Sequence, residues 1–306
     1  MKVVLLSGGG GGARFARGLA DVLEPGELTV IGNVGDDVEI LGLSVSPDLD
    51  SLLYTLGGLI DGERGWGRVD ETWNALESAA SFGGEDWFRL GDRDVGLHLV
   101  RSRALRDGTP LSEITAELFA RAGVGVRILP ATDDRLRTHV LTSAGRFSFQ
   151  EWYVGRRHRD EVDAVEYDGA KRARPAPGVV EVLEEADAIL FAPSNPYLSI
   201  GPILAVDAIR RAIAQRRVRC VAVSPLVAGR AVTGPLGRML TRMAGGTTQT
   251  LVTDRYKGLI DVLVIDESDA AAELPADVEV VVTTTLMTDR DAERRLAEVV
   301  VEVACA

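Results

Sequence analysis

The chain has 306 residues, enough for one large α/β domain or two smaller ones, and 46% of its residues are hydrophobic, so it can build a full core. Its 46 acidic and 34 basic residues give a net charge of −12, which argues against a general nucleic-acid binder with a basic face. No stretch reaches the roughly 18 apolar residues of a membrane span, and the short run after Lys2 is too brief for a signal peptide. We therefore expect a cytoplasmic protein that binds neither nucleic acid nor a membrane.

The two cysteines, Cys220 and Cys305, lie far apart in the sequence. Two distant cysteines suggest neither a disulfide framework nor a zinc site. We expect a small buried residue at the first position and a thiol near the C-terminal end at the second.

The first 17 residues contain an apolar β-branched run over residues 2–6, then Ser7 and five glycines, then the start of an amphipathic helix at Ala13. A strand, a glycine loop and a helix N-terminus form a phosphate-binding arrangement, because glycine allows close backbone approach and the helix presents free N–H groups. Five consecutive glycines match almost any glycine motif, and Arg14 follows where a Walker loop would have lysine. A ligand-free turn is the alternative. The candidate phosphate-binding residues are Gly8, Gly9, Gly10, Gly11, Gly12 and Arg14.

A second strand is expected over residues 28–31, and it ends in a polar stretch over residues 32–37. Ligands of open α/β sheets sit at the carboxyl ends of the strands, so this stretch should face the glycines. Residues 38–46 alternate as in a small hairpin, and residues 47–56 predict a helix with Asp48 as N-cap.

Four aspartates lie in these two segments, two after the strand and two at the start of the helix. Oxygen ligands of this kind suit magnesium, which takes one or two carboxylates together with substrate phosphates. Aspartate also serves turns and helix caps well, so structural roles are the alternative. The candidate metal ligands are Asp36, Asp37, Asp48 and Asp50.

Residues 57–123 predict mainly helices, over residues 71–80, 92–106 and 112–122. In the loop before the second of these, Trp87 and Phe88 stand beside Arg89. Aromatic residues next to an arginine can bind a planar ligand or an anion, or they can fasten the next helix to the core. His98 lies within a helix among apolar residues, where we expect it to be packed rather than catalytic.

From residue 126 the hydrophobic period changes to two, which predicts short antiparallel strands over residues 126–129, 136–141 and 146–154 in a β-rich insertion. A cluster of positive charge follows in this acidic chain. Most such clusters are solvated surface, and a flap over an anionic substrate is the alternative. Its members are Arg156, Arg157, His158, Arg159, Lys171, Arg172 and Arg174.

The C-terminal part returns to an α/β pattern. Strands are expected over residues 188–192, 218–223, 262–265 and 278–282, and helices over residues 179–185, 203–215, 236–243 and 289–303, the last capped by Asp289. The first of these strands leads into a stiff polar loop over residues 193–202 that offers a second helix N-terminus to an anion. Its candidate binding residues are Ser194, Asn195, Ser199 and Gly201.

These elements predict an α/β fold with a Rossmann-like parallel sheet flanked by helices. Residues 1–60 and 175–306 should form the nucleotide-binding core. Residues 61–174 should form a helical and β-rich insertion over the active site.

Six sequence blocks together resemble the 2-phospho-L-lactate transferase family (CofD/FbiA), over nearly the whole chain and in order. The ending Ala-Arg-Phe of the first block is similar to the bacterial branch. The blocks are Ser7-Gly-Gly-Gly-Gly-Gly-Ala-Arg-Phe15, Asn33-Val-Gly-Asp-Asp37, Pro47-Asp-Leu-Asp-Ser51, Tyr54-Thr-Leu-Gly-Gly58, Leu90-Gly-Asp-Arg-Asp94 and Ala192-Pro-Ser-Asn-Pro196 with Ser199-Ile-Gly-Pro-Ile203.

The resemblance implies transfer of a phospho-acyl unit, such as phospholactyl or phosphoenolpyruvyl, from a guanosine diphosphate-type donor. The implied acceptor is the ribityl hydroxyl of 7,8-didemethyl-8-hydroxy-5-deazariboflavin, with release of GMP and a need for Mg²⁺, in coenzyme F-420 biosynthesis. It implies a homodimer as well. Which acyl group the donor carries stays open.

Carried over by position, Asp50 and Arg89 match the family's deazaflavin-binding positions, and Asp50 would also be the catalytic residue. Asp36, Asp37 and Asp48 would lie beside them at the metal, while the glycines and the 193–202 loop would hold the donor. The main alternative is a regulator of the same superfamily that binds nucleotide-sugars without turnover. Binding of the deazaflavin would distinguish the two.

Overall fold

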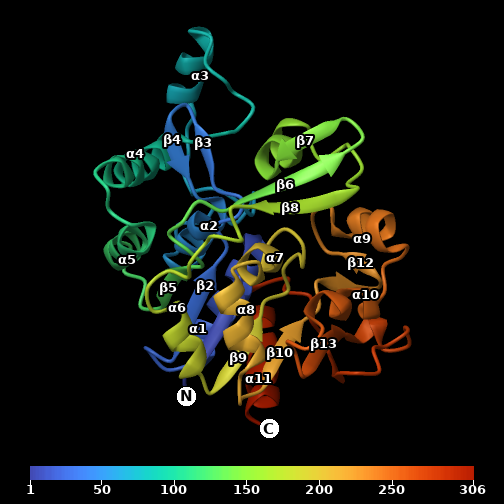
Figure 1. Cartoon of the computed structure of the whole chain (residues 1–306). Helices are drawn as coiled ribbons and strands as arrows, with labels where there is room; N and C mark the ends of the chain where they lie inside the picture. The colour runs from blue at the N-terminus through green and yellow to red at the C-terminus, as the bar shows by residue number, and fades with distance from the viewer.

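The computed structural model describes residues 1–306 and contains a seven-stranded sheet with the order β14-β13-β10-β9-β1-β2-β5 (Figure 1). Every neighbouring pair in this sheet is parallel. The strands are β1 Val3–Ser7, β2 Leu28–Gly32, β5 Arg127–Pro130, β9 Ala188–Phe191, β10 Cys220–Val223, β13 Val262–Asp266 and β14 Glu279–Thr283. The expected α/β class with a Rossmann-like parallel sheet is confirmed.

The four central strands β1, β9, β10 and β13 are buried along their entire length. Parallel strands with helices on both faces need apolar side chains throughout, which is why these segments are almost continuously Val, Ile, Leu and Ala. The helices are α1 Gly9–Val22, α2 Pro47–Leu56, α3 Asn74–Ser81, α4 Asp92–Arg106, α5 Leu111–Arg121, α6 Val179–Glu184, α7 Ile200–Leu204, α8 Asp207–Ala214, α9 Leu236–Ala244, α10 Gln249–Thr253 and α11 Arg290–Cys305. None of them combines the length and the apolar composition that a membrane crossing requires.

The helices divide between the two faces as right-handed crossovers demand. The chain moves from β1 to β2 in one direction and from β9 to β10 in the other, so α1 and α8 cover opposite faces. Helix α11 packs on α1, and Gly18 makes this crossing possible, because a Cβ there would collide with the backbone carbonyl of Glu293. The predicted N-cap of α11 is confirmed, since the Asp289 carboxylate accepts from the Ala292 N–H at 2.8 Å.

Two accessory parts stand above the carboxyl ends of the sheet strands (Figure 1). One contains the β3–β4 hairpin, Val38–Ile40 and Leu43–Val45, with α3 and α4 beside it. The other is an antiparallel sheet in the order β7-β6-β8, with β6 Arg137–Thr142, β7 Gly145–Ser148 and β8 Ala164–Asp168. Two-residue strands β11 Leu226–Val227 and β12 Arg230–Ala231 form a further small ribbon near α9.

The expectation of an antiparallel strand over residues 126–129 is wrong. Strand β5 pairs in parallel with β2 and forms the edge of the main sheet. Its Ile128 and Leu129 are buried, so the apolar pair is covered by helices rather than by a hairpin partner. Short apolar strands of the two kinds look alike in sequence, and only the neighbouring strand distinguishes them.

Three other local expectations are corrected. The strand expected over residues 146–154 ends at Ser148, and Glu151–Gly155 form a π-helix that buries Trp152. The helix expected over residues 203–215 is divided into α7 and α8, which are separated at Val206. Strand β8 was not expected, because its alternation is weak. The cysteine expectations hold: Cys220 is buried in β10, Cys305 is exposed and both thiols are free.

Two helical glycines should respond in opposite ways to the same substitution. Gly18→Ala forces α1 away from α11 and should lower the free energy of unfolding by about 2 kcal/mol. Gly96→Ala in α4 meets nothing within 4 Å and should raise it by about 0.5–1 kcal/mol. Urea unfolding of both variants is the measurement. Equal effects would contradict the close α1–α11 contact.

Candidate active site

The topology of the sheet has its switch point between β1 and β9, and we use the word crevice for the place outside the carboxyl ends of these two strands. From β1 the chain runs to β2 on one side, while β9, β10, β13 and β14 lie on the other. Ligands of open α/β sheets bind at such a switch point, outside the carboxyl ends of the strands. Ser7 ends β1 here and Ser194 follows β9, so the glycine segment and the 193–202 loop meet at this point.

The glycines do not form a separate loop, which corrects the expectation of a helix starting at Ala13. Helix α1 begins at Gly9, so four of the five glycines form its first turn, and Gly8 is the extended N-cap. Three segments crowd Gly8: a Cβ there would lie 2.5 Å from Asp48 Oδ2, 2.8 Å from the Ser199 Cβ and 3.1 Å from the Asn33 Cβ. Close packing therefore requires glycine at this position, whereas a Cβ on Gly10 would meet nothing within 4 Å. The first N–H groups of a helix have no partner within the helix, and that of Gly9 bonds to Asp48.

Asn33, the residue after β2, connects three parts of the site. Its side-chain Nδ2 donates to Asp36 Oδ1 at 2.7 Å and to Asp48 Oδ2 at 2.9 Å, and it lies 3.2 Å from the carbonyl oxygen of Leu198. Its Oδ1 accepts from the Gly35 N–H at 2.8 Å. Asn33 is fully buried, so these bonds are made away from water. The sequence marked the position only as a strand end.

Asp48 is not the N-cap that the sequence predicted. Helix α2 starts at Pro47 with Ser46 as its N-cap residue, and no side chain caps it. The Asp48 carboxylate instead accepts from Asn33 and from the Gly9 N–H, which joins α2 to the first turn of α1.

Three of the aspartates are held in surroundings that favour their protonated forms. Burial raises the pKa of Asp48 to about 6 and that of Asp37 to about 7. The pKa of Asp36 is raised well above its usual range, first by burial and then by the charges of Asp48 and Asp37. Carboxylates so placed gain from a bound cation, which would offset the unfavourable charge.

This arrangement fits Mg²⁺ at two carboxylates rather than four. No group of three or more His, Cys, Asp or Glu side chains is positioned to hold a metal. Asp36 and Asp48, brought together by Asn33, match the one or two carboxylates that Mg²⁺ takes alongside phosphate oxygens and water. Magnesium binding and the individual ligands remain predictions.

Asp50 lies in a separate buried network with α4. Arg101 donates to both of its carboxylate oxygens, and the Asp50 Oδ2 is also 3.8 Å from His98 Nδ1. Burial lowers the pKa of His98 to about 4, so the ring is neutral and its Nδ1 accepts from Arg101 at 3.2 Å. His98 is packed as expected, and the packing includes a partner of Asp50.

Sequence reasoning missed Arg101, although a signal was present. Asp94, His98 and Arg101 recur at helical spacing on one face of α4 and are buried, while Leu99 and Val100 are 52% and 57% exposed. Because α4 buries these polar side chains and exposes apolar ones, its polar face is directed into the protein, toward Asp50. Asp94 joins this network by accepting from the Tyr54 hydroxyl at 2.6 Å.

Arg89 belongs to a basic and aromatic surface near α2. Its guanidinium lies 4.7 Å from the ring centre of Trp73, and that of Arg64 lies 5.0 Å from the same ring. Arg64 also donates to the carbonyl oxygen of Arg68. The Arg68 guanidinium lies over the ring of Tyr54, a residue that follows Asp50 by one turn of α2. In contrast, the predicted pair Trp87 and Phe88 packs on the β3–β4 hairpin, which favours the fastening role.

The predicted donor-binding residues divide into two groups. Ser194, Ser199 and the glycines border the crevice, and the Ser194 hydroxyl donates to the carbonyl oxygen of Gly8 at 2.7 Å. Asn195 orders its own loop by accepting from two backbone N–H groups, and Gly201 makes room for the Tyr167 hydroxyl. Arg14 is directed elsewhere: it pairs with Glu293, which is fully buried between α1 and α11.

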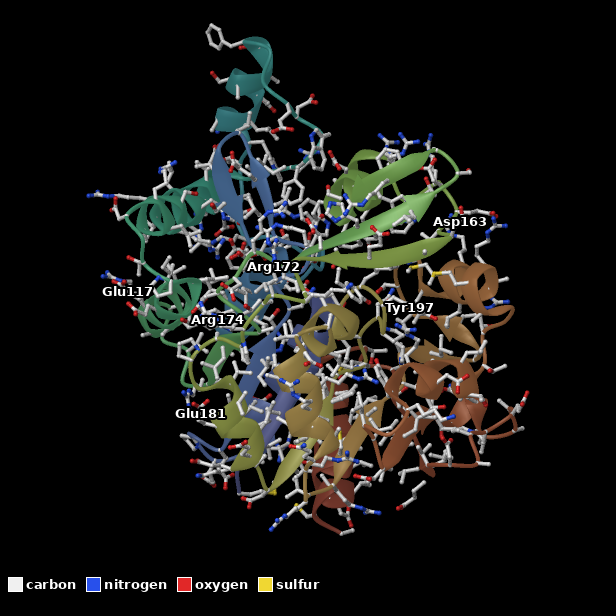
Figure 2. The ribbon with its side chains drawn as sticks, in the orientation of Figure 1. Glu117, Asp163, Arg172, Arg174, Glu181 and Tyr197 are labelled. Atoms are coloured by element: carbon white, nitrogen blue, oxygen red, sulfur yellow. The ribbon has the colours of Figure 1, made fainter.

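The positive cluster that follows β7 is mostly solvated. All its members except His158 are exposed, and Arg156 pairs with the nearby Asp160. Figure 2 shows Arg172 and Arg174 to the left of the three-stranded sheet, toward α5 and α6, and Tyr197 on the loop below β8. Tyr197 marks the point where this sheet attaches, because its carbonyl oxygen accepts from the Tyr167 hydroxyl at 2.6 Å.

Comparison with known proteins gives a consistent result. The family described as 2-phospho-L-lactate transferase CofD matches residues 3–305. A phosphoenolpyruvate transferase of Streptomyces griseus is 45% identical, over 99% of this chain and 98% of that protein. One of Thermobifida fusca is 44% identical, over 99% and 98%. A crystal structure of a UPF0052 family protein from Bacillus halodurans has a TM-score of 0.63 at 17% identity, covers 98% of both chains and shares the fold.

Asp48→Asn should change how stability depends on pH. The folded pKa of Asp48 is raised to about 6, so the folded state holds its proton more tightly and wild-type stability should fall as pH rises from about 4 to about 7. Asn keeps an acceptor oxygen for Asn33 but carries no charge. At about pH 8 without divalent metal, the free energy of unfolding of the variant should exceed that of wild type by about 2–3 kcal/mol.

Denaturant unfolding at about pH 4 and about pH 8 in EDTA checks this prediction. Asp86→Asn, an exposed aspartate in a loop, is the matched control and should follow wild type. A stability profile of Asp48→Asn that parallels wild type at both pH values would contradict the unfavourable burial of the Asp48 charge.

Proposed function

This chain belongs to the 2-phospho-L-lactate transferase CofD family, and on that premise we propose the reaction that it catalyses. It transfers a phosphoenolpyruvyl unit from a guanosine diphosphate-type donor to the ribityl hydroxyl of 7,8-didemethyl-8-hydroxy-5-deazariboflavin and releases GMP, in coenzyme F-420 biosynthesis. The observation that carries the proposal is the Asp36–Asn33–Asp48 cluster, which meets the glycine turn of α1 at the switch point of the sheet.

The choice of acyl group rests on the relatives. Proteins 42–45% identical over almost the whole chain carry the name phosphoenolpyruvate transferase. At this level of similarity we favour the enolpyruvyl donor over the lactyl or glyceryl one. The three donors differ by only a few atoms, so direct comparison of them is part of the test.

Phosphoryl-type transfer depends on positioning and charge neutralisation more than on covalent chemistry. The N–H groups of the glycine turn and the Ser199 hydroxyl hold the donor phosphates. When bound, Mg²⁺ neutralises charge on the diphosphate, and Asp36 and Asp48 are the residues that would hold it. Asp37, in the same turn as Asp36, is held by the Ser46 hydroxyl, which donates to its carboxylate at 3.0 Å.

Asp50 serves the acceptor. The acceptor hydroxyl oxygen bonds to the phosphorus of the phospho-acyl unit, the bond from that phosphorus to the GMP oxygen breaks, and the hydroxyl proton passes to the Asp50 carboxylate. Arg101 and His98 hold Asp50 in place for this step. Because both Asp50 oxygens already accept from Arg101, we assign Asp50 to the acceptor and not to the metal.

The basic and aromatic surface binds the deazaflavin ring. Arg64, Trp73 and Arg89 present two guanidinium groups and an indole, which suit a flat ring with acidic oxygen and nitrogen atoms. Tyr54 and Arg68 connect this surface to Asp50, so a ligand lying on it extends its side chain toward the carboxylate. A homodimer and a cytoplasmic location complete the proposal and rest on the family resemblance.

Titration with the deazaflavin, followed by its fluorescence with and without Mg²⁺, tests the acceptor site. Wild type should bind saturably, and Arg89→Gln should weaken binding by about 10-fold, the effect of one charge-assisted contact. Arg106→Gln, an exposed arginine at the end of α4, is the matched control and should bind as wild type does. No binding by wild type with Mg²⁺ and GMP present would favour the nucleotide-sugar regulator.

Asp50→Asn should reduce the rate of GMP release by at least about 100-fold, because the acceptor hydroxyl loses its proton acceptor. Asn keeps an oxygen for Arg101 but leaves the buried Arg101 charge uncompensated, so the free energy of unfolding should fall by about 3–5 kcal/mol, and the rate is measured on protein shown to be folded. GMP release and product mass, measured with lactyl, enolpyruvyl and glyceryl donors, give the readout. A folded and fully active Asp50→Asn protein would remove Asp50 from the mechanism.

A further inference from the structure

Arg137, the first residue of β6, brings a positive charge to the aspartate cluster from the three-stranded sheet. The backbone N–H of Thr138, the next residue along β6, donates to the carbonyl oxygen of Gly35, so Arg137 lies beside the turn that carries Asp36 and Asp37. Arg137 is half-buried, donates to the carbonyl oxygen of Leu136 at 2.7 Å and forms no ion pair. A guanidinium with five N–H donors therefore keeps most of them free beside the crevice.

The pairing of β6 with β8 explains why Arg137 stays unpaired. Arg137 and Asp168 are opposite each other in the two strands, but the Asp168 carboxylate accepts from Arg135 at 3.0 Å. Arg135 thus neutralises the carboxylate nearest to Arg137 along the sheet. The remaining carboxylates near Arg137 are those of the Asp36–Asp37 turn.

Thr138 provides a second polar group at the same place. Its backbone N–H donates to the carbonyl oxygen of Gly35 at 2.5 Å, which fixes β6 to the turn that carries Asp36 and Asp37. Thr138 is 1% exposed, and its hydroxyl has no hydrogen-bond partner. That hydroxyl lies next to Gly35, since a Cβ on this glycine would be 2.6 Å from it. Buried hydroxyls without partners are uncommon and mark positions where a ligand or water completes the bonding.

We propose that Arg137 and Thr138 form an anion clamp that binds the diphosphate of the nucleotide donor on the side opposite the glycine turn. The inference rests on the proposed function and adds the residues that close the donor site. A series of contacts supports this placement: the Gly9 N–H on Asp48, Asn33 between Asp48 and Asp36, and the Thr138 N–H on the carbonyl oxygen of Gly35 next to Asp36. A phosphate group at the aspartates then meets helix N–H groups on one side and a guanidinium on the other.

The three-stranded sheet gives the clamp a firm support. Its β8 end is attached to the 193–202 loop by the Tyr167 hydroxyl, and its β6 end to the Gly35 turn. Both attachments lie beside the donor site, so Arg137 is held from two sides without a carboxylate partner of its own. The clamp should therefore act on donor binding and leave the deazaflavin surface around Trp73 unaffected.

Calorimetric titration with GDP in the presence of Mg²⁺ tests the clamp, together with steady-state KM values for donor and acceptor. Arg137→Gln should weaken GDP binding and raise the donor KM by about 10- to 100-fold, and Arg137→Lys should recover part of the loss. Thr138→Val should weaken GDP binding by about 5-fold. The acceptor KM should change by less than about 2-fold in all three.

Arg146→Gln is the matched control, because it removes the same charge from the neighbouring strand β7, where Arg146 is exposed and pairs with Glu166. Unchanged GDP binding in Arg137→Gln, an equal loss in Arg146→Gln, or a change confined to the acceptor KM would overturn the inference while the proposed function stands. Wild type that binds GDP through Arg137 but transfers no phospho-acyl group would overturn the function and leave the clamp supported. Wild type that does not bind GDP would overturn both.

Discussion

The amide of Asn33 is the interaction on which the site depends. One buried NH₂ group donates to two carboxylates that come from different segments and would otherwise repel each other. The same side chain lies beside the 193–202 loop and accepts from the Gly35 N–H. An amide can do this because it offers two donors and an acceptor without adding charge. The strand end of β2, the start of α2 and the loop after β9 are thereby held in one position.

That arrangement is costly for the protein without ligand. Asp36, Asp37 and Asp48 are removed from water, and burial favours their neutral forms. A cation or a proton relieves the cost, so the cluster is prepared for a charged ligand rather than for stability. Asp50 shows the opposite solution, because Arg101 and His98 surround its carboxylate in the same core. Two kinds of aspartate site thus lie a few residues apart in sequence, one with buried carboxyls that share little positive charge and one whose carboxylate is neutralised by Arg101.

The accessory parts complete the site because the sheet supplies only one side of it. Helix α4 turns its polar face inward to reach Asp50, which accounts for the exposure of Leu99 and Val100. The three-stranded sheet brings Arg137 and Thr138 to the Gly35 turn and is fastened at Tyr197. Neither part has the α/β pattern of the core, and both reach the site through contacts between residues far apart in sequence.

The sequence by itself determined the α/β class and the order of most strands and helices, and it predicted a site at the glycines, the aspartates and the 193–202 loop. These features depend on local periodicity and on residue types that occur near one another in the chain. Tertiary structure decided the rest. It placed β5 in the main sheet, paired Arg14 with Glu293 and Asp50 with Arg101, and joined Asn33 to both Asp36 and Asp48. The physical reason is that a side chain's partner is set by which distant segments pack together, and a strand, a helix or an arginine shows the same local pattern whichever partner it meets.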